Sequence, residues 1–111
     1  MHKYRTRKCD ELRIENVGEE VKLSGFVKTI RDIGGVIFIE LRDHYGITQI
    51  IVTDKELIEK VHKINVESTI CVEGTVVKRD EENVNKAHRT GEIEVSAKKI
   101  EVLGDALNVL P

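Results

Sequence analysis

Apolar and polar residues alternate along most of this chain, and the alternation predicts β-strands. In the clearest case, residues 36–41, three apolar side chains fall on one strand face, Ile37, Ile39 and Leu41. A polar turn at 42–46 and a second alternating run at 47–52 follow. We therefore expect a hairpin whose inner face joins the core and whose other face, exposed to solvent, carries Phe38 and Gln49.

Three further strands are expected at residues 20–31, 68–78 and 91–103, because each segment repeats the same period of two. Gly25 stands in the middle of the first of these strands. A glycine there suggests a sharp bend of the kind that barrel strands make.

A helix is predicted at residues 55–64, where four apolar residues recur at helical spacing, Leu57, Ile58, Val61 and Ile64. Asp54 precedes the helix and can accept hydrogen bonds from its first free amides. The element order is then three strands, one helix and two strands. This is the order of the OB-fold, an all-β, five-stranded Greek-key barrel with a helix between its third and fourth strands, which binds oligonucleotides or oligosaccharides.

The chain has 111 residues, of which 40% are hydrophobic and 34% charged, as expected for one globular domain. We place this domain at residues 1–104, and residues 105–111 are typical of the start of a hinge to a further domain. No apolar run reaches the ~20 residues that span a bilayer, and no signal peptide is evident, so we expect a cytoplasmic chain without membrane contact. Cys9 and Cys71 are expected to be reduced thiols.

The formal net charge of −2 argues against a general nucleic-acid coat protein, which needs a large positive excess. Basic side chains can still gather on one side, and Lys28, Arg42 and Arg79 are candidates for contacts to a phosphate backbone. The sequence has no glycine-rich phosphate loop, no His/Cys metal spacing and no recognisable nucleophile motif. We therefore expect no active site, no metal site and no cofactor in this domain.

Three residues around the hairpin can carry binding chemistry, and each has a plainer interpretation. The ring of Phe38 can stack on a base, or it can pack against a neighbouring element. Gln49 can offer a donor and an acceptor to a base edge, or it is an ordinary surface amide. Arg31 can reach a phosphate or a base, or it can pair with Asp32.

The last third of the chain adds three more candidates. Glu92 opens the final strand and can accept hydrogen bonds from the amine and ring N–H of a guanine, although a solvated charge like that of Glu94 fits the spacing equally. Asn83 and Asn85 lie in the polar loop before it, where they can read a base edge or build turns. The residues alone leave these alternatives open.

The run from Arg31 to Gln49 reads Arg-Asp-x-Gly-Gly-x-Ile-Phe-Ile-x-Leu-Arg-Asp-x-x-Gly-Ile-x-Gln. Two other segments are Leu-Ser-Gly-Phe-Val at 23–27 and Thr-Gly-Glu-Ile-Glu-Val at 90–95. Together these segments resemble the N-terminal domain of bacterial-type aspartyl-tRNA synthetases, and the match covers nearly the whole chain.

The resemblance implies an anticodon-binding OB-fold that grips the anticodon stem-loop of tRNA(Asp), whose bases are G or queuosine, U and C. In that family the phenylalanine matching Phe38 stacks on the central uridine, and the residues matching Gln49 and Arg31 contact the same base. The glutamate matching Glu92 recognises the first base. The loop near the third base carries two matching asparagines, Asn83 and Asn85.

The resemblance also implies a class II catalytic domain that is absent from these residues, uses ATP and Mg²⁺ and forms a homodimer. This chain alone is then not expected to aminoacylate, and it can be a monomer. Thr29 and Ile30 stand where many members have arginines, so two phosphate-seeking charges are missing. The alternative is a free-standing OB-fold module that binds single strands without sequence preference or bridges proteins.

Overall fold

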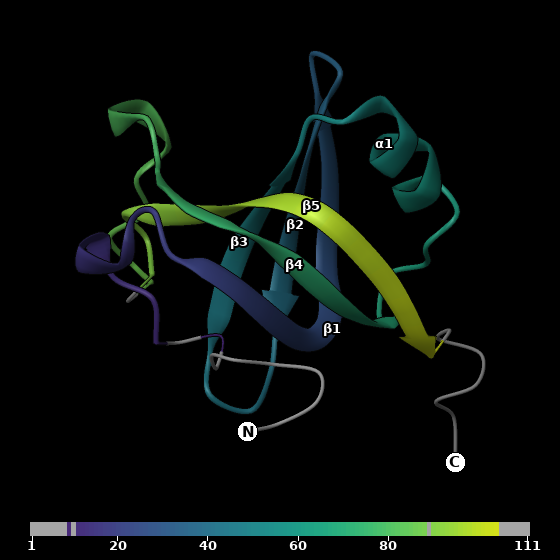
Figure 1. Ribbon diagram of the computed structural model, residues 1–111, viewed down its shortest axis with the longest axis horizontal. Helices are drawn as coiled ribbons and strands as arrows, with labels where there is room; N and C mark the ends of the chain where they lie inside the picture. The colour runs from purple at the N-terminus through teal and green to yellow at the C-terminus, as the bar shows by residue number, and fades with distance from the viewer. Residues whose placement is uncertain (1–8, 10, 89, 105–111) are drawn as a thin grey trace.

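The computed structural model describes residue 9, residues 11–88 and residues 90–104. Five strands form a closed barrel in the spatial order β1-β2-β3-β5-β4 (Figure 1). They are β1 (Glu20–Ile33), β2 (Val36–Arg42), β3 (Ile47–Val52), β4 (Thr69–Lys78) and β5 (Ile93–Gly104). The predicted OB-fold is confirmed. The predicted hinge at 105–111 lies outside the described residues, as does the segment 1–8 of the predicted domain.

One α-helix, α1 (Lys55–Val61), connects β3 to β4 as predicted, and Asp54 caps it by accepting hydrogen bonds from the backbone N–H groups of Glu56 and Leu57. The helix is shorter than the predicted 55–64. After Val61 the chain tightens into a turn, in which the Ile64 N–H donates to the Val61 carbonyl at 2.9 Å. Ile64 is nevertheless buried. Apolar residues at helical spacing indicate which side chains are buried, but they do not fix where the helix ends.

The first strand serves both halves of the barrel. Residues 20–26 pair with β4, and residues 26–33 pair with β2. At the change-over, a Cβ atom on Gly25 would lie 2.4 Å from the carbonyl oxygen of Arg42, so only glycine fits there. This close approach explains the predicted bend.

The barrel closes through β5, which runs parallel to β3 and antiparallel to β4. Ile50 of β3 lies opposite Val95 of β5. The register between β4 and β5 shifts at Glu73/Gly74, which leaves Lys98 as an extra residue on the β5 side.

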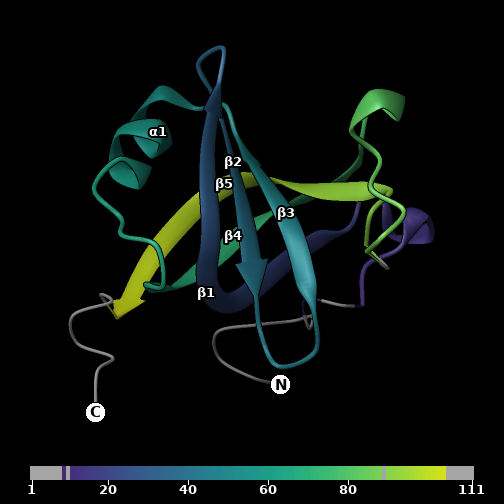
Figure 2. The same ribbon diagram turned by 180° about the vertical axis from the view of Figure 1, so that it is seen from behind.

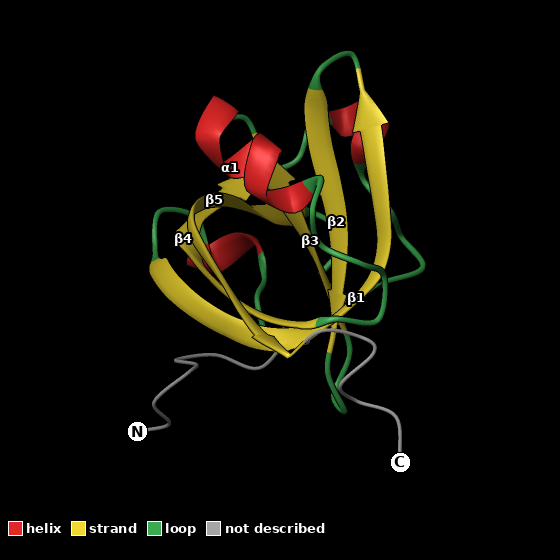
Figure 3. Cartoon of the chain, turned by 90° about the vertical axis from the view of Figure 1, so that its right-hand side faces the viewer, coloured by secondary structure: helices red, strands yellow, loops and turns green. Residues whose placement is uncertain are grey.

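Apolar side chains from all five strands fill the barrel, and α1 lies across one of its ends (Figure 3). The short 3₁₀ helices η1 (Ile14–Asn16) and η2 (Glu81–Asn83) lie at the other side of the molecule, together with the β4–β5 loop, as two opposite views show (Figures 1 and 2). The helix α1 and the β4–β5 loop therefore lie on different sides of the barrel.

Cys9 and Cys71 are both buried in this packing, and neither is part of a disulfide. Burial raises the pKa of the Cys71 thiol, which keeps it protonated at neutral pH. Among the described residues, no helix has the length and apolar character needed to cross a membrane.

Candidate functional site

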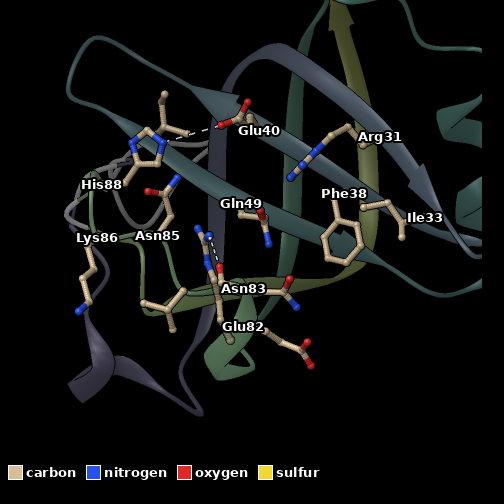
Figure 4. A pocket seen from close by; sticks show the side chains of 13 residues that line it. Arg31, Ile33, Phe38, Glu40, Gln49, Glu82, Asn83, Asn85, Lys86 and His88 are labelled. Carbon is tan, nitrogen blue, oxygen red and sulfur yellow. Dashed lines mark hydrogen bonds and ion pairs between the residues drawn. The ribbon is translucent and has the colours of Figure 1, made fainter.

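A hollow of about 350 Å³ opens between the outer faces of β1, β2 and β3 and the β4–β5 loop (Figure 4). One side, which we call the strand wall, consists of Arg31, Ile33, Phe38 and Glu40. The other side, the loop wall, consists of Arg79, residues 82–86 and His88. Gln49 of β3 lies between the two walls.

Phe38 occupies the middle of the strand wall. It is only partly buried, whereas its neighbours Ile37 and Ile39 are fully buried in the core, so the predicted placement of the ring outside the barrel is confirmed. Strand pairing sets Phe38 opposite Arg31 on β1 and opposite Ile51 on β3. The ring is therefore flanked by a cation and an apolar surface.

Gln49 shares the face of Phe38, as predicted, but it is not exposed to solvent: only 6% of it is accessible. Its Nε2 donates a hydrogen bond of 2.8 Å to Oε1 of Glu94. Because β3 and β5 are parallel with Ile50 opposite Val95, Gln49 and Glu94 stand side by side. The side chain of Gln49 makes no other hydrogen bond among the described residues, so its carbonyl oxygen and one amide proton remain for a ligand.

Glu94 is a buried carboxylate, with 8% of its surface exposed. Burial raises the pKa of Glu94, while the hydrogen bond from Gln49 and the charge of Arg79 act in the opposite direction. Sequence reasoning singled out Glu92 instead. Glu92 is exposed and precedes β5, and its carbonyl oxygen accepts a hydrogen bond from the N–H of Arg79. Neither glutamate is among the residues that line the hollow, and Glu94 adjoins it through its hydrogen bond with Gln49.

Nothing in the local pattern separates Glu94 from Glu92, because alternation along the predicted strand at 91–103 assigns both to one face. The pairing of β5 with β3 distinguishes them, since it brings only Glu94 beside Gln49.

Arg79 was predicted as a backbone contact, yet it is 5% exposed. Its Nε donates to the carbonyl oxygen of Ile93 at 2.6 Å, and its Nη1 donates to the carbonyl oxygen of Asn83 at 3.2 Å. Burial lowers the pKa of Arg79, and the nearby carboxylates of Glu94 and Glu40 raise it again. Arg79 therefore ties the loop wall to the start of β5.

Asn83 and Asn85 both line the hollow from the loop wall. Asn85 also builds the loop, because its Oδ1 accepts a hydrogen bond from the Ala87 N–H at 3.0 Å. Its backbone passes so close to Gly91 that a Cβ atom there would lie 1.7 Å from the Asn85 carbonyl oxygen. The side chain of Asn83 is exposed and makes no hydrogen bond within the described part of the chain.

The three remaining candidates, Arg31, Lys28 and Arg42, are all exposed. None of them forms an ion pair among residues 9, 11–88 and 90–104, so the predicted alternative of an Arg31–Asp32 pair is not observed there. Arg31 lines the hollow, while Lys28 and Arg42 lie next to it in a second depression. Arg31 thus lies in the first hollow, and the other two cations lie in the second depression.

Thr29 has a structural role at the position where the resemblance leads one to expect an arginine. Its Oγ1 donates a hydrogen bond of 2.7 Å to Oε1 of Glu40, and Oε2 of Glu40 faces Nε2 of His88 at 3.9 Å. These contacts join the two walls across the hollow (Figure 4). The described residues contain no group of three or more His, Cys, Asp or Glu that could hold a metal ion.

Comparison with known proteins gives a family match over residues 21–103, to the tRNA anticodon family of OB-fold nucleic acid binding domains. The chain is 49% identical over its full length to an aspartate–tRNA(Asp/Asn) ligase of Rickettsia akari, and 50% identical over 96% of its length to an aspartate–tRNA ligase of Streptomyces avermitilis. It spans only 19% and 18% of these relatives. A solved structure of a putative aspartyl-tRNA synthetase from Leishmania major is also similar, with a TM-score of 0.79, 30% identity, and coverage of 100% of this chain and 23% of that one.

Proposed function

This chain belongs to the tRNA anticodon family of OB-fold nucleic acid binding domains, and we propose that its hollow binds the anticodon loop of tRNA(Asp). One observation carries the proposal: the ring of Phe38 lies in the hollow beside the exposed guanidinium of Arg31 and near the hydrogen-bonded pair of Gln49 and Glu94. A stacking surface, a cation and base-edge hydrogen-bonding groups are what recognition of single-stranded RNA requires.

The central base of the triplet is assigned to the strand wall. Phe38 supplies the face on which the base stacks, and Arg31 approaches the same base or its phosphate from the neighbouring strand. Gln49 presents a carbonyl oxygen that can accept the N3–H of a uridine, because its Nε2 is already held by Glu94. Cytosine has no proton at N3, so this geometry favours uridine.

The first base is assigned to Glu94 rather than to Glu92. A guanine offers two adjacent N–H donors, and a carboxylate accepts both. Glu94 accepts a hydrogen bond from Gln49, which lines the hollow, whereas Glu92 lies before the start of β5.

The third base is assigned to the loop wall, where Asn83 and Asn85 line the hollow. The Oδ1 of Asn85 accepts a hydrogen bond from the Ala87 N–H, so its Nδ2 is the group that remains for a base. A cytosine offers acceptors at O2 and N3 for such donors.

For the whole protein, the similarity to aspartate–tRNA ligases supports an ATP- and Mg²⁺-dependent ligase whose catalytic part lies outside this chain and forms the dimer. The relatives include both aspartate–tRNA and aspartate–tRNA(Asp/Asn) ligases. Aminoacylation of tRNA(Asp) and of tRNA(Asn) by the full-length protein tests this proposal and separates the two specificities.

The decisive experiment on the chain itself is a fluorescence titration with an RNA hairpin bearing GUC in its loop, compared with hairpins changed at one triplet position. We expect the GUC hairpin to bind most tightly, with a loss of affinity at each changed position. Equal affinity for all hairpins would favour the sequence-independent module instead. Absence of binding to any hairpin would contradict RNA binding at this site.

A further inference from the structure

A second depression, also of about 350 Å³, lies beside the hollow just described. It is bounded by Lys28 of β1, Arg42 at the end of β2, Tyr45 in the β2–β3 turn and Thr90 of the β4–β5 loop. It shares two lining residues with the first hollow, Ile47 and His88. The two depressions therefore adjoin on the surface of the barrel.

The charge of the second depression differs from that of the first. The first is lined by Glu40 and Glu82, whereas among the described residues no carboxylate lines the second, which has Lys28 and Arg42. Both cations are exposed, and neither forms an ion pair in the described part of the chain. A depression with free cations and no carboxylate attracts an anion such as a phosphate.

The acidic residue nearest in sequence, Asp43, is directed at main-chain groups. Its Oδ1 accepts hydrogen bonds from the N–H groups of Tyr45 at 2.8 Å and Gly46 at 3.1 Å, and its Oδ2 accepts one from Cys9 at 2.9 Å. These bonds fix the turn at 43–46 that carries Tyr45. Asp43 thereby braces the turn that carries the ring of Tyr45.

Tyr45 is 49% exposed and lines the depression. On the opposite side, the Oγ1 of Thr90 donates a hydrogen bond of 2.5 Å to the carbonyl oxygen of Ile47, which attaches the β4–β5 loop to β3. The depression thus has a ring on a braced turn, two cations and a fixed far side. A volume of about 350 Å³ falls at the lower end of the range of ligand pockets, ~300–1,000 Å³, and suits a single nucleotide.

We infer that this depression is a fourth nucleotide subsite, which holds the nucleotide that flanks the anticodon triplet on one side. The base stacks on Tyr45, and the phosphate next to it lies between Lys28 and Arg42. The inference rests on the proposed function, because a flanking nucleotide reaches the second depression only if the triplet fills the first hollow. It extends recognition from three bases to a longer stretch of the loop.

The test combines a protein variant with an RNA modification. Tyr45→Ala and Tyr45→Phe are titrated with the GUC hairpin and with two modified hairpins, in which the nucleotide before or after the triplet lacks its base. We expect Tyr45→Ala to bind the intact hairpin about tenfold more weakly and Tyr45→Phe to bind it like the parent chain. On one of the two abasic hairpins the parent and Tyr45→Ala should bind equally, which identifies the flanking side.

The inference is overturned if Tyr45→Ala binds the intact hairpin with parental affinity, or if its loss of affinity is the same on both abasic hairpins. Phe38→Ala separates this failure from failure of the proposed function. If Phe38→Ala weakens binding while Tyr45→Ala does not, only the fourth subsite is wrong. If neither the parent nor any variant binds the hairpin, the proposed function itself fails.

The phosphate contact has its own readout, the dependence of affinity on salt concentration. Removing one phosphate contact with a single strand lowers the magnitude of the slope of log K against log salt by ~0.7. We expect such a decrease for Lys28→Gln and for Arg42→Gln. Lys63→Gln, an equal change of charge at an exposed residue after α1, serves as the control and should leave the slope unchanged. Slopes that match this control for both variants overturn the phosphate contact.

Discussion

The strand wall and the loop wall of the hollow are built in different ways. On the strand wall, Arg31 and Phe38 project from a regular pair of strands, and the guanidinium forms no ion pair among the described residues. On the loop wall, Arg79 is buried and donates hydrogen bonds to the carbonyl oxygens of Ile93 and Asn83.

This difference separates two tasks of a binding site. Arg31 and Phe38 of the strand wall are accessible to a ligand, whereas Arg79 of the loop wall holds the main chain of the loop in place. Mutations on the two walls should therefore differ in whether stability or RNA affinity changes.

The largest expected effect is on stability, at the loop wall. Arg79→Met keeps much of the side-chain volume but leaves the carbonyl oxygens of Ile93 and Asn83 and the carboxylate of Glu94 without their cation. We expect a decrease of ~3 kcal/mol in the free energy of unfolding, measured with urea. Arg31→Met is the matched control and should change it by less than ~0.5 kcal/mol. Similar losses for both variants would show that the walls do not differ.

The opposite result is expected for the ring of the strand wall. Phe38→Ala should weaken binding of the GUC hairpin by ~1–3 kcal/mol, because the base loses its stacking surface. Circular dichroism should show an intact barrel, since the ring lies outside the core. Unchanged affinity in a titration would remove Phe38 from the set of binding residues.

Glu94 and Glu92 are the two candidates for contact with the first base, and a smaller effect is expected from the one that makes this contact. Glu94→Gln should reduce the preference for guanine over adenine at that position by ~1.5 kcal/mol, because the amide presents a donor where the base also has one. Glu92→Gln carries the same change of charge two residues away and should leave the preference intact. If the two variants exchange these results, the assignment returns to Glu92.

A smaller effect is expected where the walls meet. Gln49→Leu removes the carbonyl oxygen that we assign to uridine, and it should lower the preference for uridine over cytidine at the central base by ~1 kcal/mol. Hairpins with GUC and GCC in the loop provide the measurement. Equal discrimination by the parent and the variant would argue that Gln49 only positions Glu94.

The smallest effect concerns pH. Burial raises the pKa of Glu94 above its ordinary value of 4.5, so the folded state retains this proton to a higher pH than the unfolded state does. The resulting stabilisation is complete below the ordinary pKa and is lost as pH rises through the raised value. Glu94→Gln should abolish this decline, as urea unfolding of both proteins across that pH range would show. A parallel decline in the variant would assign the effect to another group.

Sequence patterns predicted the strand wall well. Alternation placed Ile37 and Ile39 inside and Phe38 outside, and the structure has that arrangement. The helix shows where patterns go wrong, because the apolar spacing continued to Ile64 while the helix ends at Val61. A buried residue in a turn and a buried residue in a helix can both be apolar at helical spacing, so the sequence does not distinguish them.

The polar residues at and around Gln49 were much harder to predict. Gln49 was expected in solvent and is buried, and Arg79 was expected at a phosphate and is bonded to the main chain. Glu92 and Glu94 could not be separated, because the alternating pattern assigns both to the same face of the predicted strand. Each of these outcomes depends on which strand lies next to which, and the pairing of β3 with β5 joins residues that are 45 positions apart.

The sequence by itself determined the order of the elements, the bend at Gly25 and the faces of the hairpin. These features follow from local geometry, since side chains alternate along a strand whatever lies beside it. Only the tertiary structure decided that Glu94 holds Gln49, that Arg79 braces the loop and that the two depressions adjoin. Closing the barrel sets these distances, because it brings together chain segments that no local pattern connects.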